Sequence, residues 1–137
     1  MSSNWFTEKH EASGSSIGYR VDDKLAEAEQ PFQHIEVYRT TDWGNLMVID
    51  GCPMLTTRDN FLYHDMMTHP ALYTHAAPAN VVIIGGGDCG TLREVLRHPE
   101  VESVVQIDID EQVTRLAEKY FPELCESNGD PRAELLF

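Results

Sequence analysis

The chain has 137 residues, which is enough for one ordinary domain or for a small domain and part of a second. Hydrophobic residues make up 42% and charged residues 24%, a composition that predicts a packed core and excludes disordered and collagen-like chains. Ten basic residues against 23 acidic ones give a formal net charge of -13, which argues against a nucleic-acid partner because phosphate binding depends on lysine and arginine.

Neither a membrane segment nor a metal site is predicted. No apolar run approaches the roughly 20 residues that a membrane span needs, and the first ten residues lack the basic and then apolar order of a signal peptide. Cys52, Cys89 and Cys125 are spaced neither for a disulfide framework nor for zinc, and the histidines within 64–75 are not spaced for one helical face. We therefore expect a cytoplasmic protein with reduced thiols.

The first part of the chain reads as a small β-rich unit. The first thirty residues have little periodicity and are predicted to form an arm with one strand near 17–21. From Gln33 onward, the apolar Ile35 and Val37 alternate with polar neighbours, which is typical of a half-buried strand. Two apolar strands separated by turns complete a meander. These strands are predicted at 46–50 and 54–57, and the turns at 42–45 and 51–53.

A helix is predicted to follow the meander. Its first turn can be capped by Asp59 or Asn60, it continues through Met67, and Pro70 is expected to end or kink it. Residues 76–79 form the predicted linker, so that the two domains are placed at 1–75 and 76–137.

The second part has the pattern of a parallel sheet with crossover helices. The apolar run at 81–84 is rich in β-branched residues, which is typical of a strand buried on both faces. Apolar residues at helical spacing, a strand, a second amphipathic helix and a last strand follow. The helices are predicted around 92–96 and 113–120, and the strands at 104–108 and 133–137. This β-α-β-α-β order predicts the opening of a doubly wound α/β domain.

A glycine-rich motif lies between the first of these strands and its helix. Gly85, Gly86, Gly87 and Gly90 satisfy G-x-G-x-x-G in the context where the pattern binds nucleotides. Asp108 ends the next strand, about 20 positions on, where an acid can accept hydrogen bonds from ribose hydroxyls. An adenosine-containing ligand is predicted. The alternative is a turn that merely packs helix on strand, with a solvated acid at the strand end.

Asp88 distinguishes between ligands. A carboxylate inside the loop would repel a pyrophosphate and attract a cation, so a dinucleotide is disfavoured and a sulfonium nucleoside that carries an amine is favoured.

Residues 85–96, with the sequence GGGDCGTLREVL, resemble the glycine-rich signature of spermidine synthases and related aminopropyltransferases. Three more segments, 50–51, 55–59 and 63–67, are similar to the region between the two domains of that family. The resemblance implies a small β-rich domain followed by a Rossmann-like domain of the methyltransferase type. It also implies transfer of an aminopropyl group from decarboxylated S-adenosylmethionine to putrescine, which gives spermidine and methylthioadenosine.

The resemblance assigns roles by matching position. Gln33 would contact the nucleoside donor, and His64 with Tyr63 would line the polyamine cleft. Asp88 would hold amine groups and Asp108 would hold the ribose. Considered without the resemblance, Gln33 reads as a polar residue at a strand start, His64 as an ordinary helix histidine and Tyr63 as a core aromatic.

Four residues depart from the family pattern. Cys89 stands where glycine is more usual, which suits a negative φ and makes the thiol a potential reporter. Pro53 and Met54 replace a polar residue, so donor contacts from that turn are in doubt. Asp108 is shorter than the usual glutamate, which implies a shifted ribose.

The family's catalytic base is the first aspartate of an Asp-Ser-x-Asp-Pro segment after the fourth sheet strand. The chain reaches Phe137 without such a segment, so we expect a fragment of an aminopropyltransferase, without its own catalytic residue and without turnover alone. In this fragment the strand at 81–84 would be an unpaired sheet edge. No cofactor is expected, because decarboxylated S-adenosylmethionine is a co-substrate.

The expected partners are putrescine, decarboxylated S-adenosylmethionine and a second copy of the chain, paired through the N-terminal β domain. Two other functions stay open. An S-adenosylmethionine-dependent methyltransferase would share the glycine loop and the ribose acid, and a non-catalytic fragment would retain only a role in assembly.

Overall fold

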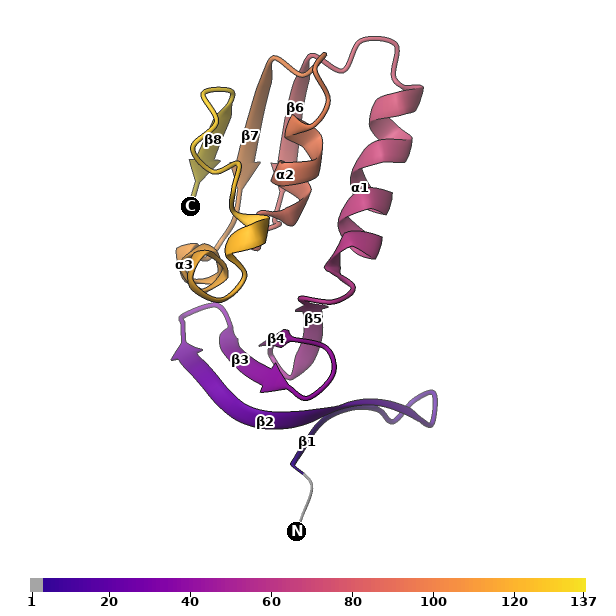
Figure 1. The fold of residues 1–137 in the computed structure, drawn as a ribbon, viewed down its shortest axis with the longest axis vertical. Coiled ribbons are helices and arrows are strands. Elements are labelled where there is room, and N and C mark those ends of the chain that lie inside the picture. The colour runs from indigo at the N-terminus through magenta and orange to yellow at the C-terminus, as the bar shows by residue number, and fades with distance from the viewer. Residues whose placement is uncertain (1–3) are drawn as a thin grey trace. The chain divides into compact units, whose positions relative to one another are not determined.

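A computed structural model describes residues 4–137 of the chain. The chain divides into two compact units, of which the first ends at Asp59 and the second comprises Asn60–Phe137 (Figure 1). The first unit is built from antiparallel strands, and the second combines a parallel sheet with helices. The structure confirms the predicted α/β class and the order of its parts.

The first unit is a five-stranded antiparallel meander in which each strand pairs with the next along the chain. The strands are β1 (Trp5–His10), β2 (Ser15–Glu29), β3 (His34–Thr40), β4 (Asn45–Ile49) and β5 (Cys52–Thr56). Its buried apolar residues include Ile35 and Val37 of β3 and the central residues of β4. The predicted alternation at Ile35 and Val37 is confirmed, because these two residues are buried and their immediate neighbours are not.

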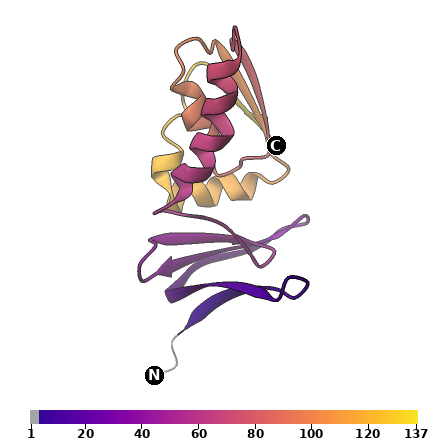
Figure 2. The same ribbon diagram turned by 90° about the vertical axis from the view of Figure 1, so that its right-hand side faces the viewer.

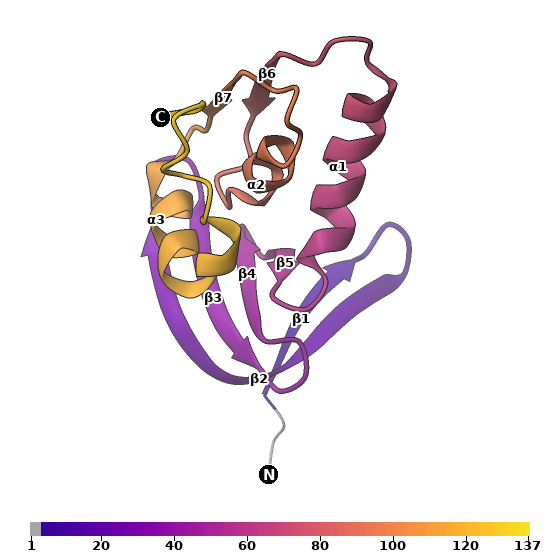
Figure 3. The same ribbon diagram turned by 45° about the horizontal axis from the view of Figure 1, so that its top comes forward.

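The arm predicted for the first thirty residues is wrong for the part that the structure describes, although the strand predicted near 17–21 lies within β2. β1 and the 15-residue β2 form a hairpin, and β2 also pairs with β3. Two register shifts, at Val21/Asp23 and at Lys24/Ala26, interrupt the second pairing, and such bulges bend a strand (Figure 3). Most residues of β2 are exposed, so its sequence lacks the regular alternation by which a half-buried strand is recognised.

The hairpin between β4 and β5 turns at Asp50 and Gly51. Their φ angles of 51° and 78° place both residues in the left-handed region that a two-residue type I′ turn requires. The Asp50 carboxylate also accepts the backbone N–H of His34 at 2.8 Å. The turn therefore precedes the predicted position by one residue, and Cys52 and Pro53 belong to β5.

The second unit begins with a helix and continues as a β-α-β-α-β chain. Its elements are α1 (Asn60–Thr74), β6 (Asn80–Ile84), α2 (Gly90–Leu96), β7 (Ser103–Ile107), α3 (Glu111–Tyr120), the 3-10 turn η1 (Pro122–Leu124) and β8 (Ala133–Leu136). The three strands are parallel and lie in the order β6-β7-β8. The short turn η1 was not predicted. Each helix among residues 4–137 is too short or too polar to cross a bilayer.

Helix α1 continues past Pro70 to Thr74, so the prediction that this proline ends the helix is wrong. The hydroxyl of Thr74 donates to the Pro70 carbonyl at 2.7 Å, within the last turn. Helix α1 lies beside α2 (Figure 2). The side chain of Leu72 packs on the core formed by β6, α2 and β7. Because α1 packs on the residues that follow it, the two units divide before this helix, whereas the sequence placed the division after it.

One face of the parallel sheet carries the core. Ile83, Leu92, Val95 and Val104 are buried there with their neighbours. On β6, in contrast, Val82 is 63% and Ile84 88% exposed, so burial of this strand on both faces is not observed. β6 is the edge of the three-stranded sheet, and no described element covers the face that Val82 and Ile84 share.

Arg132 lies just before β8 and bonds to three segments of the second unit. Its guanidinium donates to the carbonyls of Leu96 at 2.8 Å and Val101 at 3.1 Å, and it pairs with Asp130 at 2.9 Å. Leu96 ends α2, where a carbonyl has no partner within the helix. The bonds from Arg132 lower the pKa of Asp130 to about 2.

Candidate functional site

The glycine loop connects β6 to α2, and glycine is required at its positions for different physical reasons. Gly85 and Gly86 both have a φ of +81°, which side chains rarely adopt. Gly87 is crowded, because an added Cβ would lie 3.0 Å from the Asp108 carboxylate and from Val113. At Gly90 an added Cβ would collide with the ring of His64. The motif therefore serves close approach as much as backbone conformation.

Asp108 lies directly after β7 and is held by backbone amides. Its Oδ2 accepts the N–H of Gly87 at 2.8 Å, and its Oδ1 accepts the N–H of Asp110 at 3.0 Å. The hydroxyl of Thr114 donates to the Gly87 carbonyl at 2.8 Å and fixes the same peptide. A carboxylate has about four lone-pair positions, so these two bonds leave capacity for ligand hydroxyls.

Asp88 is the acid inside the loop. Its Oδ1 accepts the N–H of Gly90 at 2.8 Å and lies 3.1 Å from Nε2 of His64. Within residues 4–137 both contacts use the same oxygen, and 17% of the side chain is exposed. The second oxygen is thus left for an ammonium or another donor.

His64 reaches the loop from α1 and is fully buried. Its contact is with Asp88, and its Nδ1 has no hydrogen-bond partner among the described residues. Tyr63 is 58% exposed and meets the His64 ring edge-on at 5.4 Å between centroids, so it is not a core aromatic. The direct ligand contacts that the resemblance implies for these two residues stay predictions.

Gln33 belongs to the first unit, where it immediately precedes β3 and is partly buried. Its backbone carbonyl accepts the N–H of Gln30 at 3.0 Å, which closes the turn between β2 and β3. The structure thus groups Asp88, His64 and Asp108 around one loop, and Gln33 keeps its predicted role as a hypothesis.

Cys89 has a φ of +67°, so the condition under which a cysteine suits this position is not met. A non-glycine residue in this region costs on the order of 1–2 kcal/mol. The side chain is fully buried, and its thiol donates to the Gly87 carbonyl at 3.5 Å. Burial also makes this thiol a less accessible reporter than the sequence suggested.

A buried carboxylate that the sequence did not single out lies on α2. Glu94 is fully buried and bonds to Arg93 at 2.8 Å and to Arg97 at 2.6 Å. Burial raises the pKa of Glu94, but the two guanidinium groups outweigh it and hold the pKa below its usual range. Asp65 and His69 of α1 complete a group with metal-ligand composition. Arg93 and Arg97 already supply the positive charge that a metal ion would bring to Glu94.

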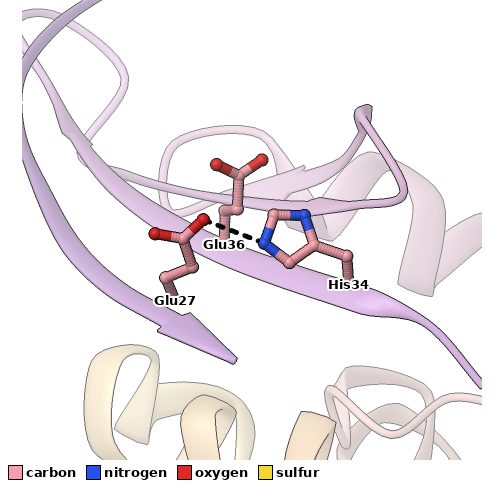
Figure 4. A group of neighbouring side chains, drawn as sticks. All are labelled: Glu27, His34 and Glu36. Carbon is pink, nitrogen blue, oxygen red and sulfur yellow. Dashed lines mark hydrogen bonds and ion pairs between the residues drawn. The ribbon is translucent and has the colours of Figure 1, made fainter. Parts of the chain in front are cut away.

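A second such group lies on the antiparallel sheet. Glu27 of β2 and His34 and Glu36 of β3 turn their side chains toward one another (Figure 4). Lys24 Nζ lies 2.7 Å from Glu36 and 3.1 Å from Glu27, so a lysine occupies the place of a cation. Sequence spacing could not reveal either group, because its members come from different elements.

Comparison with known proteins decides the family. Residues 60–137 match the spermine/spermidine synthase domain. The chain belongs to this family. Residues 4–57 match a second family domain, described as the spermidine synthase tetramerisation domain. The two matches meet where the chain divides into its two units.

Two curated relatives of this spermine/spermidine synthase family protein share one name. Polyamine aminopropyltransferase of Xanthomonas campestris pv. campestris (strain B100) is 70% identical over 134 residues, which are 98% of this chain and 47% of the relative. The protein of the same name from Xylella fastidiosa (strain M12) is 71% identical over 133 residues, with 97% and 47% covered. The chain spans about half the length of the curated relatives it matches.

Solved structures agree with this assignment. Spermidine synthase from Thermotoga maritima superposes with a TM-score of 0.94 at 33% identity, over 100% of this chain and 48% of that one. A spermidine synthase in complex with the transition state analogue AdoDATO gives the same TM-score and identity, over 100% and 47%. The comparisons confirm the predicted family and fold.

Proposed function

We propose that the protein transfers an aminopropyl group from decarboxylated S-adenosylmethionine to putrescine and releases spermidine and methylthioadenosine. The relatives' shared name, polyamine aminopropyltransferase, supports this reaction. The observation that carries it within this chain is Asp88, a carboxylate built into the nucleoside loop and held by His64 and Gly90.

The charges of the site favour this donor over a dinucleotide. Asp88 and Asp108 put two carboxylates at one glycine loop, where a pyrophosphate would be repelled and a sulfonium with an amine would be attracted. In this proposal Asp108 accepts the ribose hydroxyls and Asp88 accepts an ammonium N–H. His64 then acts through Asp88, because its buried ring holds that carboxylate in place.

The reaction is an in-line displacement at the carbon beside the sulfonium, so the attacking amine must be neutral. Free putrescine amines resemble lysine, with a reference pKa near 10.4, and a base must take the proton as the bond forms. We assign no such base among residues 4–137. We propose that it comes from residues outside these, that no cofactor takes part, and that residues 1–137 alone bind ligand without turnover.

We further propose a cytoplasmic oligomer that assembles through the first unit. The match of residues 4–57 to a tetramerisation domain supports assembly, while the number of copies is left to experiment. A homodimer is the expected minimum. Sedimentation of the chain, and of residues 60–137 alone, tests whether the first unit carries the association.

Calorimetric titration of the 137-residue chain tests the two carboxylates separately. Asp108→Asn should weaken methylthioadenosine binding about 10-fold or more, because hydrogen bonds to a charged group are lost. Asp88→Asn should weaken the binding of decarboxylated S-adenosylmethionine far more than the binding of methylthioadenosine, because only the first of these ligands has the amine. Glu102→Gln, an exposed acid in the same unit, is the matched control and should change neither.

The titration also separates the alternatives. A methyltransferase site would bind S-adenosylhomocysteine in preference to methylthioadenosine and would ignore putrescine. A chain that serves only assembly would bind none of the three. If Asp88→Asn weakened both nucleosides equally, the carboxylate would have no special role toward the amine, and the proposed donor would be wrong.

A further inference from the structure

Two thiols from distant parts of the second unit meet at the glycine loop. Cys89 lies inside the loop, and Cys125 follows η1 directly. Each thiol shifts the pKa of the other. Cys89 Sγ also donates to the Gly87 carbonyl at 3.5 Å, and Cys125 Sγ to the Asp88 carbonyl at 3.8 Å. Both sulfur atoms therefore adjoin the same short stretch of backbone.

The surroundings differentiate the two thiols. The hydrogen bond from Cys125 lowers the pKa of Cys89, and burial opposes this while the amides of Gln106 and Asn128 add to it. The same contact with Cys89, together with burial, raises the pKa of Cys125. Nearby Asp88 and Glu118 disfavour charge on Cys125. The first thiolate of the pair therefore forms on Cys89.

Access differs as well. Cys89 is fully buried, whereas Cys125 is partly exposed. A small oxidant therefore meets Cys125 first, and Cys89 is placed beside it to resolve the product. Cys89 also sits at a positive φ, a conformation that side chains rarely adopt.

We propose that Cys89 and Cys125 form a reversible disulfide that ties the glycine loop to the turn after η1. The oxidant is a low-molecular-weight disulfide. Cys89 first loses its proton to solvent, and its thiolate then takes the proton of Cys125 while the Cys125 sulfur attacks one sulfur of the oxidant, which breaks the oxidant's S–S bond and releases one thiol. Cys89 then attacks the Cys125 sulfur of the mixed disulfide and releases the second thiol. Two protein thiols are oxidised, and the oxidant is reduced to two thiols that take up both protons.

Oxidation would change the loop itself. The bonds from the two thiols to the carbonyls of Gly87 and Asp88 require S–H hydrogens, which the disulfide lacks. The segment that carries Asp88 would lose both bonds at once. The disulfide can be detected whatever reaction the protein catalyses, because its test measures the sulfur chemistry directly.

The experiment uses the full chain with Cys52→Ser, because Cys52 is exposed, lies in the first unit and would react on its own. This variant is equilibrated with mixtures of reduced and oxidised glutathione, trapped with iodoacetamide and measured by mass spectrometry. As oxidised glutathione increases, the two alkylation sites should disappear together and the mass of the unalkylated chain should fall by about 2 Da. A monomer with one peptide linking Cys89 to Cys125, cleaved by dithiothreitol, is the expected product.

Two controls keep the test decisive. In Cys52→Ser/Cys125→Ser and in Cys52→Ser/Cys89→Ser, no intramolecular loss of mass should occur, and Cys89 alone should react with glutathione more slowly than Cys125 alone. Independent alkylation of both cysteines at every glutathione ratio would overturn the proposal. So would stable glutathione adducts without a cross-link, or a disulfide found only between chains. The main measurement keeps both cysteines, so it does not depend on whether the controls fold.

Discussion

The two carboxylates of the glycine loop are held in different ways. Asp108 receives both of its hydrogen bonds from backbone amides, those of Gly87 and Asp110. Asp88 shares one oxygen between the amide of Gly90 and the ring of His64, which lies on a helix before the parallel sheet begins. One acid is therefore fixed by the local chain, and the other depends on the docking of α1.

This difference shows which parts of the glycine loop can be inferred from local sequence. The spacing from glycine loop to strand end is enough to place Asp108. The support of Asp88 requires Gly90, because only a residue without a Cβ allows the buried His64 ring to lie against the start of α2. Gly90, the last glycine of the motif, is thus the residue against which the ring of the distant His64 packs.

Gly90→Ala should have the largest effect on stability. The added methyl would collide with a buried ring, and neither the ring nor the loop backbone has room to move. We expect a loss of about 3 kcal/mol in the free energy of unfolding, measured by urea denaturation. Gly129→Ala is the matched control, since a Cβ there meets nothing and its φ is not positive. Equal stability of both variants would show that the contact is not as close as described.

A double-mutant cycle with His64→Ala should show coupling of about 2 kcal/mol between the two positions. Removal of the ring leaves space for the new methyl, so Gly90→Ala should cost much less in the His64→Ala background. Urea midpoints of the four proteins give the coupling. Purely additive effects would mean that the glycine is needed for its backbone and not for the ring.

Asp108→Asn should destabilise the chain by about 1–2 kcal/mol, more than Asp88→Asn. Asp108 uses a different oxygen for each backbone N–H. The side-chain amide of an asparagine has only one oxygen, so its NH2 group would point at one of these two N–H donors. The substitution Asp88→Asn would instead keep one oxygen for both Gly90 and His64. Thermal unfolding of the two variants checks the order, and the reverse order would contradict the different support of the two acids.

Much of the second unit followed from its sequence. Val113, Leu116 and Ala117 lie buried on α3 as their helical spacing predicts, and the loop between β6 and α2 is where the glycines placed it. Local spacing and strong apolar patterns carry such predictions. His64 was singled out by resemblance, but its burial against Gly90 could not be read from spacing, because the contact joins segments that are distant in the chain.

Other features depend on surroundings that a sequence window does not contain. β2 was mostly read as an arm, because an exposed strand that pairs on both sides needs no apolar alternation. Val82 and Ile84 were read as buried because an apolar run does not say whether a second layer covers it. The positive φ of Cys89 is likewise set by the tight loop and not by the preference of cysteine.

The position of Arg132 has a kinetic consequence. Its guanidinium contacts α2, the segment before β7 and its own turn, so these bonds can form only after the rest of the second unit is in place. We expect these bonds, which join residues 31 and 36 positions apart, to be absent from the folding transition state. Loss of this side chain should then increase the unfolding rate and leave the refolding rate nearly unchanged. Arg132 would therefore stabilise the folded chain by slowing its unfolding.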